Sequence, residues 1–267
     1  MTETINIWSG ETALYDETRP HAPGVLLDIC SQLVHLPGPP VVVDLGSGTG
    51  LSTVLWAERA RQVIGIEPNA EMRAQAERQQ FLSPHGERIQ YRDGLSTQTG
   101  LETDSVDIVT CSQSLHWMEP EPTFAEVTRI LRPGGLFVAY DYDWPPTVAW
   151  EVEQAYHEVI ARFRQIRAER AIERGVKSWS KEQHLTRMQE SGQFRYVKEL
   201  VVHQIEEGNA ERFIGLTLSY GIARYLKQRY LTEQEVGLDH LRRVAQDFIG
   251  PEPIPWYFSY RVRLGIK

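Results

Sequence analysis

The chain has 267 residues and a formal net charge of −8, and 41% of its residues are hydrophobic and 24% charged. This composition is typical of a globular protein with one large domain or a domain plus a subsidiary lobe. The acidic balance argues against a nucleic-acid partner, which needs a cationic face, and no apolar run reaches the ~18–20 residues of a membrane span. The start of the chain lacks a signal-peptide pattern, and the only cysteines are Cys30 and Cys111. We therefore expect a cytoplasmic enzyme without a disulfide framework or a metal site.

Short apolar runs alternate with segments of helical periodicity through the first half of the chain. The runs that predict strands cover residues 41–45, 63–67, 88–92, 106–110 and 136–140. The segments that predict helices cover residues 22–36, 51–61, a stretch capped by Asn69, and 121–131. Strands that alternate with helices indicate an α/β fold with a doubly wound, mostly parallel sheet.

The pattern changes after Asp143, where Trp144 and two prolines interrupt the alternation. Helices are expected over 148–173, 180–191, 209–226 and 232–249, and strands over 196–205 and 256–264. We therefore expect a Rossmann-like sheet of seven strands with an antiparallel last strand and an inserted helical lid. The corresponding division is a core of residues 1–143, a helical lid and acceptor region of residues 144–255, and a final strand of residues 256–267.

A glycine-rich turn joins the first strand to the helix that follows it. Its sequence, Asp44-Leu45-Gly46-Ser47-Gly48-Thr49-Gly50, permits a tight turn and a close approach of the backbone to a ligand. The segment resembles the D/E-x-G-x-G-x-G signature of class I S-adenosylmethionine (SAM)-dependent methyltransferases. The resemblance implies that SAM is bound by Asp44, Gly46, Ser47, Gly48 and Gly50. A nicotinamide oxidoreductase would share the fold, but Leu51 stands where its fingerprint needs a small residue.

The second strand ends at Glu67, which is followed by Pro68. A carboxylate at this strand tip can accept hydrogen bonds from both ribose hydroxyls of a nucleoside. Pro68 favours this position, because the residue before a proline is pushed towards an extended conformation. The alternative is a carboxylate that only stabilises the start of the next helix.

An acidic residue, Asp93, follows the third strand and precedes Gly94 and Leu95. In the methyltransferase family an acidic residue here accepts a hydrogen bond from the adenine amino group. The backbone N–H that follows it commonly meets a ring nitrogen. The alternative is an ordinary Asp-Gly turn.

The stretch from Cys111 to Trp117 resembles the S-x-x-x-H-W segment of small-molecule methyltransferases grouped with ubiquinone/menaquinone and trans-aconitate methyltransferases. Residues 129–135 and 15–20 are typical of the same group, so the resemblance covers about residues 12–143. It implies that the cofactor is also contacted by Tyr15, Arg19, Ser112 and Gln113, with Tyr15 a candidate for a cation–π contact to the sulfonium.

Three residues near the ends of the fourth and fifth strands are candidates for the catalytic centre: His116, Asp141 and Tyr142. A histidine side chain has an ordinary pKa near neutrality, so His116 is a candidate general base, although it can equally pack with Trp117 against the turn. Ligands of open parallel sheets bind beyond the carboxyl ends of the strands. We therefore expect an acceptor pocket lined by Trp117, Tyr140, Trp144, Ser219 and Tyr220.

The predicted function is methyl transfer from SAM to a small-molecule acceptor by in-line displacement, which releases S-adenosylhomocysteine (SAH). A hydroxyl or acidic-carbon acceptor needs a base, whereas a carboxylate or a free amine does not. One alternative is a catalytically silent SAM-binding protein with a blocked acceptor pocket. A nucleic-acid methyltransferase is disfavoured, because the N/D-P-P-Y/F stretch is missing after the fourth strand.

Overall fold

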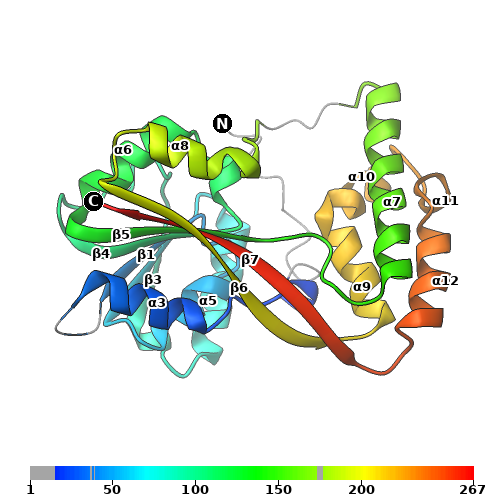
Figure 1. Ribbon diagram of the computed structural model, residues 1–267, viewed down its shortest axis with the longest axis horizontal. Helices are drawn as coiled ribbons and strands as arrows, with labels where there is room; N and C mark the ends of the chain where they lie inside the picture. Colours follow the sequence, from blue (N-terminus) through cyan, green and yellow to red (C-terminus); the bar gives the residue numbers. More distant parts are fainter. Residues whose placement is uncertain (1–15, 37, 39, 173–176) are drawn as a thin grey trace.

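The computed structural model describes residues 16–36, 38, 40–172 and 177–267, which contain a seven-stranded sheet of order β3-β2-β1-β4-β5-β7-β6 (Figure 1). The strands are β1 (Val41–Leu45), β2 (Gln62–Ile66), β3 (Ile89–Arg92), β4 (Val106–Ser112), β5 (Leu131–Tyr142), β6 (Tyr196–Gly208) and β7 (Ile254–Ile266). Strands β1 to β5 pair in parallel, whereas β7 is antiparallel to both β5 and β6. The predicted Rossmann-like sheet with an antiparallel last strand is confirmed.

Helices cover both faces of the parallel strands, as their apolar residues require. Strand β1 is buried throughout: Val42 faces one hydrophobic cluster, and Val41 and Val43 face the other. Helices α3 (Val25–Val34) and α4 (Leu51–Ala57) pack into the first cluster, and α6 (Pro120–Ile130) and α8 (His184–Glu190) into the second. Helix α5 (Ala70–Leu82) connects β2 towards β3, and Asn69 caps it by accepting from Met72 N, as expected.

A second group of helices gathers beside the far end of the sheet (Figure 1). These are α7 (Trp150–Glu169), α9 (Ala210–Thr217), α10 (Ala223–Lys227), α11 (Glu233–Val236) and α12 (Leu238–Phe248). Strands β6 and β7 reach them by continuing past β5, since residues 254–259 of β7 pair with β6 but not with β5. The apolar core is continuous from sheet to helices, with Trp256 of β7 packed against Phe213 of α9 at 5.7 Å between ring centroids.

Glycines explain where the helices depart from the sequence-based expectation. The helix expected over 209–226 is interrupted by a π-turn (Leu218–Ile222) in which Gly221 has φ of 108°. The helix expected over 232–249 is divided at Gly237, whose φ is 82°. Both angles belong to the left-handed region that glycine adopts without the clash of a Cβ atom.

Strand β5 also starts earlier than expected. Leu131 already pairs with Val106 of β4, and the register shifts before the regular pairing resumes at Leu136.

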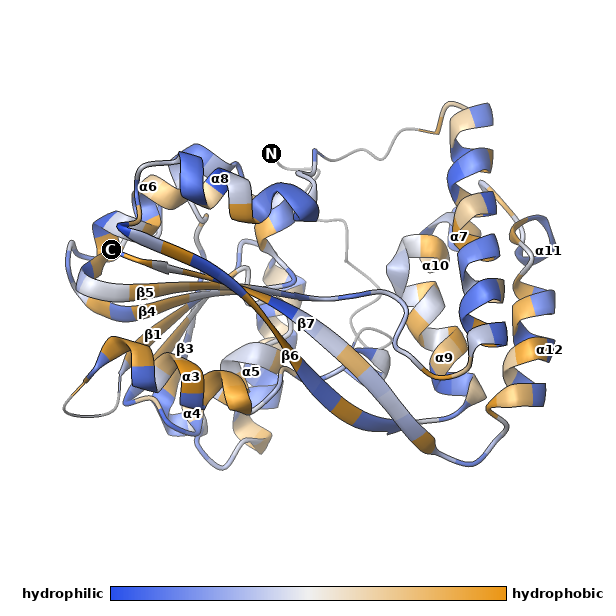
Figure 2. Cartoon of the chain, viewed as in Figure 1, coloured by the Kyte–Doolittle hydropathy of each residue, from blue (hydrophilic) through white to orange (hydrophobic). Residues whose placement is uncertain are grey.

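The hydropathy of the strands follows their position in the sheet (Figure 2). Central strands β1 and β4 are mostly hydrophobic, with Asp44 and Asp107 as their charged residues, whereas edge strand β6 alternates between hydrophilic and hydrophobic residues. Charged residues on an edge strand discourage pairing with another chain. In the described part of the chain, no helix is long and apolar enough to cross a membrane.

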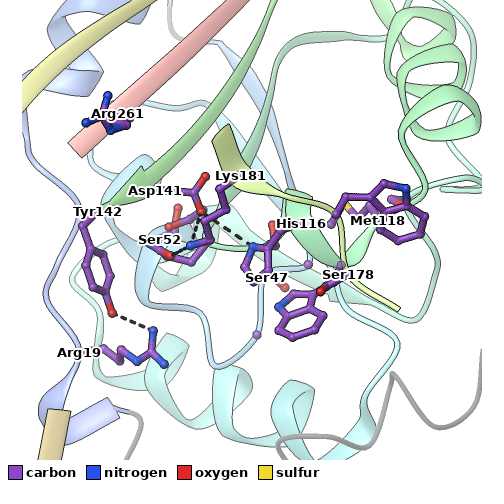
Figure 3. Close-up of a pocket in the computed structure, with 18 of the residues that line it drawn as sticks. Arg19, Ser47, Ser52, His116, Met118, Asp141, Tyr142, Ser178, Lys181 and Arg261 are labelled. Atoms are coloured by element: carbon purple, nitrogen blue, oxygen red, sulfur yellow. Dashed lines mark hydrogen bonds and ion pairs between the residues drawn. The ribbon is translucent and has the colours of Figure 1, made fainter. Parts of the chain in front are cut away.

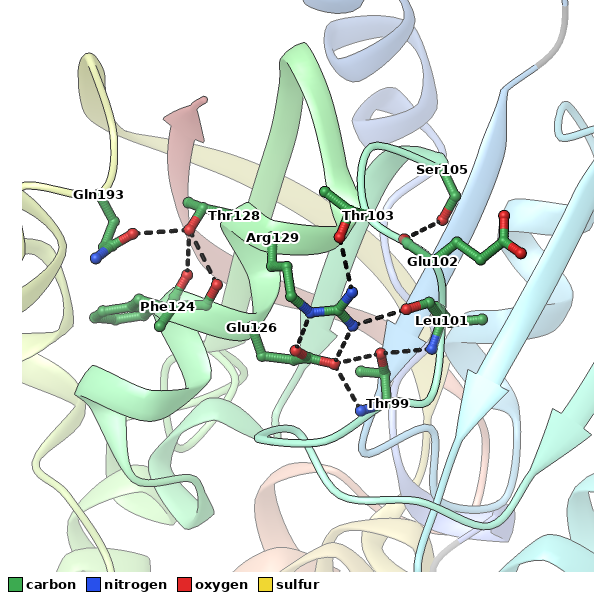
Figure 4. Close-up of polar contacts among 11 residues, drawn as sticks. Thr99, Leu101, Glu102, Thr103, Ser105, Phe124, Glu126, Thr128, Arg129 and Gln193 are labelled. Atoms are coloured by element: carbon green, nitrogen blue, oxygen red, sulfur yellow. Dashed lines mark hydrogen bonds and ion pairs between the residues drawn. The ribbon is translucent and has the colours of Figure 1, made fainter.

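An ion pair between the buried Glu126 and the partly exposed Arg129 fixes the loop between β3 and β4 to helix α6 (Figure 4). Glu126 accepts hydrogen bonds from Thr99 N at 2.8 Å and from Arg129 Nε at 2.7 Å, and Arg129 donates to the Leu101 carbonyl at 2.7 Å. The Arg129 guanidinium, helped by the Thr99 donors, lowers the pKa of Glu126 to about 2. The loop that leads into β4 is therefore held by a charge-assisted network.

Candidate functional site

A cavity of about 1410 Å³ lies beyond the carboxyl ends of β1, β2, β4 and β5. Helix α7 and residues 177–182 supply walls that face the sheet, and Figure 3 shows Lys181 and Ser178 on the same cavity as His116 and Asp141. Single-ligand pockets commonly enclose about 300–1,000 Å³. The cavity therefore has room for two small molecules side by side.

The glycine-rich turn forms one end of this cavity. Gly46 N donates to the Ile66 carbonyl at 2.8 Å, and Gly46 and Gly48 have φ of 65° and 56°. A Cβ atom added at Gly46 would lie 2.8 Å from Ser114 Cβ, whereas one added at Gly48 would meet no atom within 4 Å. Ser47 Oγ is buried without a hydrogen-bond partner among the described residues. The turn thus offers an unused polar group and exposed backbone to a ligand.

Glu67 lies beside this turn and holds it in place. Its carboxylate accepts from Gly48 N at 3.0 Å and from Asn69 N at 2.9 Å, and the side chain lines the cavity. Burial raises the pKa of Glu67, although the two backbone donors oppose the shift. Pro68 also lines the cavity, as do Gly94 and Leu95 after β3. These four residues occupy the positions expected of a nucleoside site.

Three residues expected at the cofactor lie elsewhere. Asp44 is fully buried behind the turn, where its carboxylate accepts from Thr53 Oγ1 at 2.7 Å and burial raises its pKa to about 7. Gly50 begins α4 with φ of 91°, and a Cβ there would collide with the Tyr91 hydroxyl. Neither lines the cavity. Both residues shape the turn from behind, which corrects the expectation of direct cofactor contact.

Asp93 is also absent from the cavity wall. Its carboxylate is largely exposed and pairs with Arg73 Nη1 at 3.1 Å. The adenine contact expected of Asp93 stays a prediction. Tyr15, expected to contact the sulfonium, lies outside the described residues.

The end of β4 supplies Ser112 and Gln113 to the cavity. Gln113 has φ of 52°, a left-handed conformation that is uncommon for a residue with a side chain and is often found at functional sites. Its backbone N–H donates to the Tyr140 carbonyl at 3.0 Å, and its Oε1 accepts from Lys181 Nζ at 2.6 Å. The strained turn therefore orients Gln113 across the middle of the cavity.

Asp141, at the end of β5, is the centre of a buried charge cluster (Figure 3). Its carboxylate oxygens lie 2.8 Å from Lys181 Nζ and 3.1 Å from Arg263 Nη1. Burial alone would raise the pKa of Asp141, but Lys181 and His116 together hold it below its ordinary value. A carboxylate held ionised by two cations is a weak proton acceptor. Asp141 is therefore better suited to positioning Lys181 than to the general-base role expected of it.

His116 lines the cavity between the glycine turn and residues 177–182. Its Nδ1 lies 3.9 Å from Asp141 Oδ1, which is too long for a hydrogen bond but close enough to stabilise a protonated ring. Its backbone carbonyl accepts from Trp179 N at 2.9 Å, and its ring lies 4.5 Å from that of Trp117, which also lines the cavity. His116 is thus fixed in the cavity and keeps the geometry required of a general base.

Aromatic side chains line the other end of the cavity. Tyr142, a candidate for the catalytic centre, lines it together with Trp144 and Tyr220, which are candidates for the acceptor pocket. Arg19, also in the wall, donates to the Tyr142 hydroxyl at 2.7 Å and lies 4.9 Å above the Trp144 ring. Tyr142 and Arg19 thus connect the segment before α3 to the end of β5.

Two residues expected in an acceptor pocket do not line the cavity. Tyr140 is fully buried in the core, where its hydroxyl contacts Ser52 Oγ and accepts from Trp56 Nε1 at 3.3 Å. Ser219 is buried below the wall and accepts from Arg19 Nε at 3.1 Å. Tyr140 and Tyr142 share one face of β5, but Ser52 and Trp56 of α4 cover Tyr140, while the π-turn directs Ser219 towards Arg19.

The structure also brings residues to the cavity that the sequence-based analysis missed. They come from α7 (Tyr156, Ile160 and Arg164), from the segment before α8 (Lys177, Trp179 and Lys181) and from β7 (Arg261 and Arg263). No local sequence motif identifies these residues, because each reaches the cavity through contacts with residues that are distant in the sequence. The helical periodicity of 148–173 was the only signal that involved any of them.

Comparisons with known proteins relate part of the chain to methyltransferases. Residues 43–139 match the family described as a methyltransferase domain. The chain is 30% identical over 139 residues to a protein of Saccharomyces cerevisiae named "probable S-adenosylmethionine-dependent methyltransferase", covering 52% of this chain and 47% of that protein. It is 37% identical over 98 residues, 35% of this chain and 36% of the other, to an uncharacterized methyltransferase of Mycobacterium tuberculosis. Residues 43–139 thus resemble a methyltransferase domain, and the relatives that match this part of the chain are named as methyltransferases.

Solved structures confirm the fold over nearly the whole chain. One from Anaeromyxobacter dehalogenans, named "putative type II methyltransferase", has 21% identity and a TM-score of 0.65, covering 93% of this chain and 97% of the other. The cyclase SpnF, at 18% identity and a TM-score of 0.50, covers 92% and 83%. Matches to the first three curated relatives span only 36–62% of those proteins' lengths. The similarity in fold therefore covers more of the chain than the similarity in sequence does. Because one fold can host many reactions, the similarity in fold does not define the reaction of this protein.

Proposed function

We propose that this protein transfers a methyl group from SAM to a small-molecule acceptor. The observation that carries the proposal is one continuous cavity with two chemically different ends. The glycine turn and Glu67 line one end, and Tyr142, Trp144 and Tyr220 line the other. A nucleoside-binding end joined to an aromatic end is the arrangement that brings a cofactor and an acceptor together.

The residues of the first end fit SAM. The Glu67 carboxylate, next to Pro68, is placed to accept from ribose hydroxyls, and the buried Ser47 hydroxyl has hydrogen-bonding capacity unused among the described residues. Gln113, held across the cavity by Lys181, suits contact with the methionine portion. When bound, SAM supplies a methyl group on a sulfonium and leaves as SAH after in-line displacement.

The protein's own contribution is alignment, exclusion of water and movement of one proton. Alignment of two bound reactants can contribute ~7–11 kcal/mol to lowering the barrier. Tyr142 and Trp144 supply the aromatic surface for the acceptor. His116 takes the proton when the acceptor is a hydroxyl or an acidic carbon, and the ionised Asp141 nearby stabilises the resulting imidazolium. Among the described residues, no group of three or more His, Cys, Asp or Glu side chains could hold a metal ion.

The enzymatic function is favoured over a silent SAM-binding protein because the acceptor end of the cavity is open to the cofactor end. A nicotinamide oxidoreductase is disfavoured because the Leu51 side chain lines the cavity where a dinucleotide fingerprint has a small residue. The acidic net charge supports a small-molecule acceptor rather than a nucleic acid.

Calorimetric titration of the protein with SAH, with NAD as the control, tests the proposal. We expect binding of SAH alone, followed by transfer of labelled methyl from SAM in a screen of small-molecule acceptors. Binding of NAD in place of SAH would overturn the cofactor assignment. Binding of SAH without transfer of methyl to any acceptor in the screen would favour the catalytically silent SAM-binding protein.

A further inference from the structure

The acceptor end of the cavity is a continuous aromatic wall that runs outward from the sheet. Tyr142 packs on Trp144 with ring centroids 5.0 Å apart, and Trp144 contacts Tyr156 at 6.4 Å and Tyr220 at 5.6 Å. The Trp144 and Tyr156 rings are nearly parallel, at 11°. Such a wall accepts the flat or apolar body of a ligand.

A guanidinium group stands at the outer end of this wall. Arg164 extends from α7 and donates from Nη2 to the Tyr220 hydroxyl oxygen at 2.9 Å, and both side chains line the cavity. A second cation, Lys177, lies above the Trp179 ring at 4.7 Å and also lines the cavity. The wall that holds Tyr220 therefore combines aromatic surface with the positive charge of Arg164, and Lys177 adds a second positive charge to the same cavity.

These two cations differ from others in the same wall. Lys181, Arg261 and Arg263 each form an ion pair with a carboxylate of the protein at 2.8–3.1 Å. Among the described residues, neither Arg164 nor Lys177 has a carboxylate within ion-pair distance. Glu182 is the acidic residue that acts on Arg164 from farther away, and its carboxylate already accepts from the Ser180 hydroxyl. The positive charge of this end is thus available to a ligand.

We propose that the methyl acceptor carries an anionic group, a carboxylate or a phosphate, which Arg164 and Tyr220 bind at the outer end of the cavity. The proposal rests on the methyltransferase function proposed above. The anion serves as an anchor, and the atom that receives the methyl group lies at the opposite end of a planar or apolar body, near His116 and Tyr142.

The donor chemistry of this pair suits an anion. The guanidinium presents several N–H groups in a plane that matches carboxylate and phosphate oxygens. The Tyr220 hydroxyl accepts from Arg164 and keeps its own hydrogen for donation to the same anion. Because the anchor is remote from the reacting atoms, Arg164 is a specificity-determining residue whose loss raises KM more than it lowers kcat.

Matched probes on the SAH-saturated protein test this inference by calorimetry. Cinnamate and phenyl phosphate carry an anion on an aromatic body, and cinnamamide is the neutral counterpart of cinnamate. We expect at least one anion to bind about tenfold or more tightly than cinnamamide. Arg164→Gln should abolish that preference, whereas Arg162→Gln, on the same helix but bonded to the Glu235 carbonyl, should retain it.

Preference for cinnamate supports a carboxylate acceptor, and preference for phenyl phosphate supports a phosphate. Equal binding of cinnamamide, no binding of any probe, or a preference that survives in a folded Arg164→Gln protein overturns the inference. The SAH titration is made first on each variant, and failure at that step contradicts the proposed function rather than the anion site.

Discussion

The two ends of the cavity are built in opposite ways. The cofactor end is made largely of backbone, within a stretch from Gly46 to Glu67 that spans one strand–helix–strand unit. The acceptor end is made of long side chains, which come from Arg19, Tyr142, Tyr156 and Tyr220. A site made of local backbone geometry is constrained by its own turn, whereas a site made of distant side chains changes with any of the contributing elements. This difference explains how one cofactor site can serve many acceptors.

The largest expected effect on stability and on SAH binding comes from adding a side chain to the glycine-rich turn. Gly46→Ala adds a Cβ atom that would lie 2.8 Å from Ser114 Cβ, at a left-handed φ. Strain and overpacking together should cost about 2–4 kcal/mol of unfolding free energy and remove SAH binding. Gly48→Ala, with similar φ but open space, should cost only ~1–2 kcal/mol. Urea unfolding of both variants measures the difference, and equal losses would contradict the role of close packing.

Removing the carboxylate beside the turn should weaken the cofactor end alone. Glu67→Ala should reduce SAH affinity by roughly 1.5–3 kcal/mol, since hydrogen bonds to a charged group have that scale. Glu77→Ala, on the exposed side of α5, is the matched control. Calorimetry of the two variants checks this, and an unchanged SAH affinity in Glu67→Ala would remove Glu67 from the site.

The Glu126–Arg129 network belongs to neither end and should affect stability alone. Glu126→Gln should lower the unfolding free energy by about 1–2 kcal/mol at neutral pH, with unchanged SAH affinity. Because the folded pKa of Glu126, about 2, lies below its ordinary value of 4.5, its contribution is present above pH 4.5 and is lost as pH falls towards 2. Unfolding curves of both proteins should therefore converge in acid; a constant difference would refute the linkage.

The smallest effect is expected at the acceptor end. Tyr142→Phe removes the hydroxyl that accepts from Arg19 while it keeps the aromatic ring. Acceptor binding should weaken by roughly 0.5–1.5 kcal/mol, the net value of one hydrogen bond, and SAH affinity should change less than about twofold. A titration of the variant with SAH and with cinnamate separates the two. A larger loss for SAH than for the acceptor probe would show that the ends are not independent.

Features of the molecule that depend on local backbone geometry could be predicted from the sequence. The sheet, the glycine turn and the strand-tip position of Glu67 follow from periodicity and from glycine spacing. Tyr140 was misplaced because alternation puts it on the same face of β5 as Tyr142 and does not reveal that α4 covers Tyr140. Lys181 and Arg164 could not be found, because their partners Asp141 and Tyr220 lie 40 and 56 residues away (181 − 141, 220 − 164). Long-range pairs of this kind leave no periodic trace in the chain.

The long β6–β7 ribbon has a mechanical consequence. Residues 203–208 of β6 and 254–259 of β7 pair with each other beyond the last residue pair of β5 and β7, and the helical group lies at their far end. This two-stranded extension is anchored in the sheet at one end only. Movement of the helices would therefore be spread over many inter-strand hydrogen bonds instead of being confined to one hinge residue. The distance between α7 and the strand tips therefore depends on the length of this two-stranded extension, and a deletion within it would change that distance.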